Sequence, residues 1–76
     1  MEAAEKKRIQ AIAESHFELR KLYKEHEEFE RLLSTYEHKR YLTAPEEQEQ
    51  RLLKRRKLHG VDRMMRILSE EASAAA

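Results

Sequence analysis

The stretch at residues 41–47, Tyr-Leu-Thr-Ala-Pro-Glu-Glu, holds the single proline of a 76-residue chain that also has one glycine. A residue before proline disfavours the helical conformation, so we expect the chain to leave a helix near Ala44. Thr43 and Glu46 have the spacing of a capping box, in which each side chain bonds the backbone N–H of the other residue. Pro45 then falls in the first turn of a new helix, where its missing N–H costs nothing. The stretch therefore predicts a turn between two helices.

The segments on both sides of this turn have helical spacing. In the first segment, apolar residues and one histidine recur every three or four positions, as in the seam of a coiled coil: Leu19, Leu22, His26, Phe29, Leu33 and Tyr36. The second segment has an apolar stripe of its own: Leu53, Leu58, Val61, Met64, Met65 and Leu68. Because neither glycine nor proline interrupts the first segment, we expect one helix over about 3–41, a turn over about 42–45 and a second helix over about 46–70. The small polar tail, 71–76, is expected to fray.

Two amphipathic helices joined by a short connector are expected to fold back on each other. An acidic run at residues 25–30 would then lie beside a basic run at residues 54–57, which favours an antiparallel alignment. The sequence therefore predicts an all-α fold, an antiparallel two-helix hairpin that resembles a coiled coil and forms a single domain over residues 1–76.

The first predicted helix is longer than the second, which leaves residues 3–14 without a partner inside the chain. Two hairpins that dimerise into a four-helix bundle would cover this overhang. We therefore expect a homo-oligomer or a complex with another helical protein, and the leading function is a protein–protein interaction or structural module. The candidate partner or self-association contacts are Ile9, Ile12, Leu19, Met64 and Met65.

The composition excludes several classes of protein. The absence of cysteine excludes disulfide scaffolds and cysteine-based metal or redox sites, and one glycine plus one proline cannot supply the turns of an all-β fold. No pair of histidines has the spacing of a metal-binding helix face, and no serine has a recognisable catalytic triad. We expect no catalytic residues, no cofactor and no metal, hence no enzyme. The chain has no apolar run that could span a membrane and no secretion signal at its start, so we expect a cytoplasmic protein.

A basic stretch in the second segment supports an alternative function. Nucleic acid or another anionic surface would be bound there by Lys54, Arg55, Arg56 and Lys57. We favour this function less, because the net charge of the chain is only +1 and no aromatic residue lies among these charges. The other interpretation of this stretch is a solvated helix face that pairs with the acidic run of the first helix.

Gly60 is unusual because it lies in the interior of the second predicted helix, where glycine is unfavourable. One interpretation is a close approach of its backbone to His26 or to a partner helix. The other is a tolerated defect or a slight kink.

The chain resembles the YdcH-like family of small bacterial proteins over about residues 15–68. In the first half the resemblance rests on three features: Glu25-His26, Phe29-Glu30 and Leu33. In the second half it rests on the capped turn that begins at Thr43, the basic run and an aspartate: Thr43 to Glu47, Leu53 to Leu58, and Asp62. The family usually has Leu-Lys before the aspartate, whereas this chain has Gly60-Val61. The resemblance implies a helical hairpin, and it implies no activity or site residues because the family is of unknown function.

Overall fold

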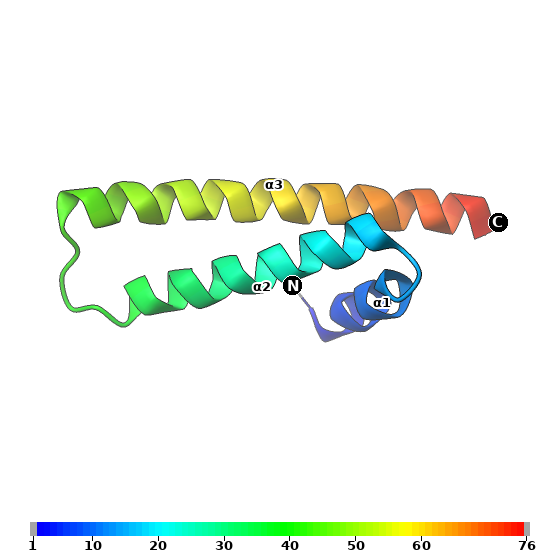
Figure 1. Ribbon diagram of the computed structural model, residues 1–76, viewed down its shortest axis with the longest axis horizontal. Helices are drawn as coiled ribbons and strands as arrows, with labels where there is room; N and C mark the ends of the chain where they lie inside the picture. Colours follow the sequence, from blue (N-terminus) through cyan, green and yellow to red (C-terminus); the bar gives the residue numbers. More distant parts are fainter. Residues whose placement is uncertain (1, 76) are drawn as a thin grey trace.

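The computed structural model describes residues 2–75, which form three helices. These are α1 (Ala3–Ala13), α2 (Phe17–Glu37) and α3 (Ala44–Ala75). Figure 1 shows α2 and α3 running antiparallel, with α1 folded against the end of this pair that lies away from their connecting loop. The predicted all-α class is confirmed for the described residues, but the predicted two-helix hairpin is replaced by an arrangement of three helices.

The chain breaks between α1 and α2, so the prediction of one helix over about 3–41 is wrong. The backbone at His16 is extended, with φ −124° and ψ 102°, and Nδ1 of its ring accepts a hydrogen bond of 3.2 Å from the backbone N–H of Leu19. His16 therefore acts as the N-cap of α2 and satisfies one of the backbone donors that a helix start leaves free. The cause of this break lies in the packing of the fold. One straight helix would leave Ile9 in water, whereas the break lets α1 fold back and bury this side chain in the core.

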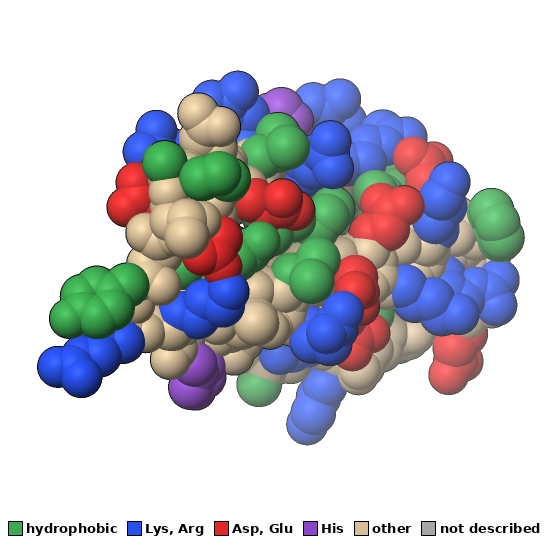
Figure 2. Space-filling view, turned by 60° about the vertical axis from the view of Figure 1, so that its left-hand side comes forward, with side chains coloured by type: hydrophobic (Ala, Val, Ile, Leu, Met, Phe, Trp, Pro, Cys, Tyr) green, Lys and Arg blue, Asp and Glu red, His purple; other side chains and the backbone are tan. Residues whose placement is uncertain are grey.

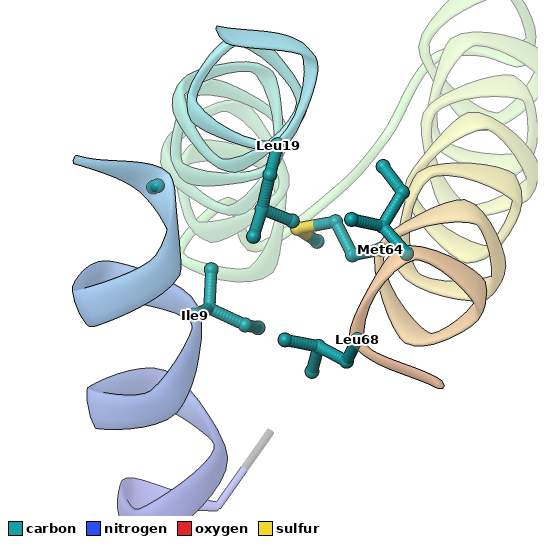
Figure 3. Close-up of a cluster of buried hydrophobic side chains, with 6 residues drawn as sticks. Ile9, Leu19, Met64 and Leu68 are labelled. Carbon is teal, nitrogen blue, oxygen red and sulfur yellow. The ribbon is translucent and has the colours of Figure 1, made fainter. Parts of the chain in front are cut away.

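The core lies where the three helices meet (Figure 3). Its buried members come from all three: Ile9, Ala13, Leu19, Met64, Ile67 and Leu68. In Figure 3, Ile9 points from α1 into the space between Leu19 of α2 and Leu68 of α3. Burying one large aliphatic side chain stabilises a fold by about 1.5–3 kcal/mol, so α1 adds materially to a small core. The prediction that residues 3–14 have no partner inside the chain is therefore wrong.

The loop between α2 and α3 contains the predicted capping box. The backbone N–H of Glu46 donates to Oγ1 of Thr43 at 3.3 Å, and the backbone N–H of Thr43 donates to Oε1 of Glu46 at 3.0 Å. The turn itself is displaced from the predicted 42–45, because α2 ends at Glu37 and α3 already begins at Ala44. Because Thr43 is the N-cap, Ala44 is the first helical residue.

The C-terminal end of α3 also differs from the prediction. The helix continues through Ala75 instead of ending near residue 70 with a frayed tail. No glycine or proline stops it there, and alanine and glutamate are strong helix formers. Residue 76 lies outside the described residues.

Acid is expected to weaken the start of α3. Hydrogen bonds from Lys39 and from Thr43 lower the pKa of Glu46 to about 2. Because this value lies below that of an unfolded chain, the contribution of Glu46 is complete above about pH 4.5 and is lost as the pH falls toward 2. We expect Tm to fall between about pH 5 and pH 2, and to fall less in Glu46→Gln. Circular dichroism melts over this range would measure both, with Glu47→Gln as the control. A melting profile of Glu46→Gln that follows the parent chain at every pH would contradict the assignment.

Candidate interaction surfaces

The five residues predicted as partner contacts lie in or beside the core. Ile9, Leu19 and Met64 are fully buried, and Ile12 and Met65 are half-buried against the same cluster. They are brought together within one chain, because α1 supplies the cover that we expected from a second chain. Contact of these residues with another protein stays a prediction. The reason given for it, that residues 3–14 have no partner inside the chain, does not hold in this fold.

The fold buries only half of the residues in the apolar seam of α2. One set of its residues, seven apart in the sequence, is buried against α3: Leu19, His26 and Leu33. The other set, also seven apart, is half-exposed: Leu22, Phe29 and Tyr36. Seven residues make about two turns, so each set forms a line along the helix. In the described structure, Leu22 at the start of the second line packs partly against the core cluster, whereas Phe29 and Tyr36 do not belong to that cluster.

One groove lies between α2 and α3 on one side of their contact, and we call it the Leu58 groove. It has a volume of about 610 Å³ and is lined by Glu30, Leu33, Ser34, Glu37, Lys54, Lys57, Leu58 and Val61. The side chain of Leu58 is 58% exposed, which is high for a large aliphatic residue beside an apolar floor. The edges are charged, with carboxylates on α2 and ammonium groups on α3, and Nζ of Lys57 lies 3.5 Å from Oε1 of Glu30. The groove thus combines an apolar floor with a polar rim, as protein interfaces do.

A second groove lies on the other side of the same contact, and we call it the Gly60 groove. It has a volume of about 330 Å³ and is lined by Leu22, Glu25, His26, Phe29, Arg56, His59 and Gly60. A Cβ atom built on Gly60 would meet nothing within 4 Å. No other side chain of the described residues, His26 included, therefore takes the place of a Cβ at Gly60. The described chain gives no packing reason for a glycine here, where alanine is favoured by about 1 kcal/mol in a helix interior.

His26 is a polar residue in the middle of the apolar contact between α2 and α3. Its side chain is 3% exposed, and Nε2 lies 2.8 Å from Oε1 of Glu30 without the alignment of a hydrogen bond. Nδ1 has no hydrogen-bond partner among the described residues. Burial raises the pKa of Glu30, but the nearby His26 and Lys57 lower it by more, so the net direction is down. The carboxylate of Glu30 therefore stays ionised beside the histidine.

The basic run does not form one face of α3. Residues next to each other on a helix point about 100° apart, so four in a row encircle it. Accordingly, Lys54 and Lys57 line the Leu58 groove, while Arg56 lines the Gly60 groove. Figure 2 shows one side of the molecule, on which acidic, basic and apolar side chains lie intermixed.

The predicted pairing of the acidic and basic runs is only partly present. Within residues 2–75, one ion pair joins them, the contact of Lys57 with Glu30. Glu28 instead pairs with Arg31 of its own helix, where Nε of the guanidinium donates at 3.1 Å. Another ion pair between α2 and α3 lies outside the two runs of charge. Nε of Arg63 donates a hydrogen bond to Oε1 of Glu18 at 2.8 Å. Sequence reasoning missed this pair because no run of charge marks it.

In the part of the chain that the structure describes, no three histidine, aspartate or glutamate side chains gather where they could hold a metal ion. None of the described helices is both long enough and apolar enough to cross a bilayer.

No family model, no curated protein and no solved structure matches this chain.

Proposed function

We propose that this chain is a small interaction module without catalytic activity, and that it binds one amphipathic helix of a partner protein in the Leu58 groove. The observation that carries this proposal is the exposed side chain of Leu58 above an apolar floor of Leu33 and Val61. A helix laid into a groove with its apolar face inward is a recurrent mode of peptide recognition. The cytoplasmic location and the resemblance to the YdcH-like family stay predictions.

The packing of α1 supports a helical partner. Val61 packs against the core cluster that α1 covers, and it also lines the Leu58 groove. The charge of Lys6 of α1 is among the causes that lower the pKa of Glu30, which lines this groove. The Leu58 groove is therefore continuous with the surface of α2 and α3 against which α1 packs.

The charged rim indicates which helix would fit. Glu30 and Glu37 lie on the α2 edge, whereas Lys54 and Lys57 lie on the α3 edge. A complementary helix would place basic side chains toward α2 and acidic side chains toward α3, with apolar residues between them. A helix with the reverse arrangement would bring like charges together, so the rim favours one orientation.

The test compares two leucines of α3 that differ in position. Leu58 lies in the groove, and Leu52, which is 43% exposed, is outside its lining. Chemical cross-linking in the native cell, followed by mass spectrometry, should recover helical partners with the parent chain and with Leu52→Asp. Leu58→Asp should lose them while keeping its helical circular dichroism, because a charge would be buried without a partner. Equal recovery by both variants would overturn the proposal, as would partners cross-linked away from the groove.

A second candidate function is binding of nucleic acid or an anionic surface by Lys54, Arg55, Arg56 and Lys57. It is supported by the exposure of the first three side chains. Their spread around α3 weakens it, because a polyanion would meet few of them from any one side. Binding of this kind is strong at about 50 mM salt and falls steeply with added salt, so a gel shift at that concentration tests it. The absence of any shifted species would remove this candidate.

A further inference from the structure

The Gly60 groove has two features that a single chain does not explain. The open space above Gly60 shows that no other segment of the described chain needs a glycine there. Leu22, which packs in part against the core cluster, and Phe29 remain half-exposed at the edge of the same groove. Among the described residues, none from α1 lines this groove, so it remains open along the pair of helices.

We propose that the Gly60 groove is the contact surface between two copies of this chain. A two-fold axis parallel to α2 and α3 would lay α2 of each copy against α3 of the other. The two helices of each new contact would then run antiparallel, as they do within one chain, and four helices would form a bundle. This inference concerns a different surface and a different partner from those of the proposed function.

Complementary charges favour the contact of α2 with the second copy's α3 over a contact of α2 with the second copy's α2. Glu25 lies on the α2 edge of the groove and Arg56 lies on the α3 edge. With α2 against the α3 of the second copy, each Glu25 faces the second copy's Arg56, and the symmetry forms this pair twice. With α2 against the α2 of the second copy, the two Glu25 edges would lie together and so would the two Arg56 edges, which like-charge repulsion disfavours. The surface is therefore complementary to itself in one orientation.

The apolar shapes agree with the charges. In this arrangement Phe29 of one copy enters the second copy's groove on the side where Gly60 leaves open space. A large side chain set against a helix position without a Cβ is a knob that meets a hole, the packing that joins helices in bundles. Leu22 lies two turns from Phe29 on the same line and would be covered by the same contact.

The test is a pair of charge reversals read by sedimentation equilibrium. We expect the parent chain to dimerise, and we expect Glu25→Lys and Arg56→Glu each to raise the dissociation constant at least about tenfold. An equimolar mixture of the two variants should form a heterodimer with the affinity of the parent, because both cross-chain pairs are restored in it. Glu27→Lys and Arg55→Glu, which lie outside the groove, are matched controls and should leave the dimer unchanged.

Steric blockage supplies a second, independent variant. Gly60→Leu should keep the helical circular dichroism of the chain, because a Cβ at this position meets open space, while the dimer is lost. The inference is overturned if the parent chain is monomeric at about 100 μM, if the mixture fails to associate, or if Gly60→Leu still dimerises. Leu58→Asp separates this inference from the proposed function, because it should leave the dissociation constant of the dimer unchanged.

Discussion

Replacing Ile9 with alanine is expected to lower the free energy of unfolding by about 2–5 kcal/mol, the cost of removing a large aliphatic side chain from a packed core. The side chain is fully buried and lies against Leu19 and Leu68. A core of this size supplies only about 3–5 kcal/mol in total, so most of the stability would be lost. Urea unfolding followed by circular dichroism measures the change directly.

The matched control is Arg8→Ala, on the same helix and exposed to solvent. A surface change of this kind falls within about 0.5 kcal/mol, so the two variants separate core packing from helix propensity. A loss below about 1 kcal/mol for Ile9→Ala would mean that α1 does not pack as described, since an exposed isoleucine costs little to truncate.

Replacing His26 with leucine is expected to raise the free energy of unfolding by about 1–3 kcal/mol. A buried polar group without a hydrogen bond destabilises a fold by this amount, and Nδ1 of His26 has no partner in the described chain. Leucine fills a similar space and continues the line formed by Leu19 and Leu33. Glu30 would keep Lys57 as a neighbour at 3.5 Å, so its charge is not stranded by the change.

Arg55→Leu is the control for this second variant, because Arg55 is exposed and lies outside the linings of both grooves. Its effect on unfolding should be within about 0.5 kcal/mol. Chemical denaturation of both variants at neutral pH gives the comparison. A stability loss in His26→Leu would show that the contact between His26 and Glu30 outweighs the missing hydrogen bond.

Local chemistry made part of this fold predictable. Thr43 and Glu46 are three residues apart, and their reciprocal hydrogen bonds form as the capping box requires. The apolar spacing of α2 likewise identified Leu19, His26 and Leu33 as residues that face a neighbouring helix. These features depend on residues within a few turns of one another, so sequence spacing contains most of the information.

The break between α1 and α2 was missed because its cause is tertiary. Neither glycine nor proline marks it, and the apolar spacing runs through it without a change of period. One local signal was present, because Ser15 and Glu18 have the same capping-box spacing as the pair at the later turn. In the fold, His16 caps the helix instead and Glu18 accepts a hydrogen bond from Arg63. The Gly60 groove could not be foreseen, since it depends on how α2 and α3 pack.

The position of α1 also sets an order of events during synthesis. Among the residues that meet in this core, Ile9 is made first, Leu19 of α2 follows soon after it, and Met64 and Leu68 of α3 come much later. A chain grows at about 5–20 residues per second, so Leu19 is made soon after Ile9, but the α3 side of the core stays open until Leu68 has been made. The pair of α2 and α3 also closes late, because each of its contacts needs a residue of α3. The three helices are therefore expected to fold as one cooperative unit once α3 has been made, rather than progressively from α1.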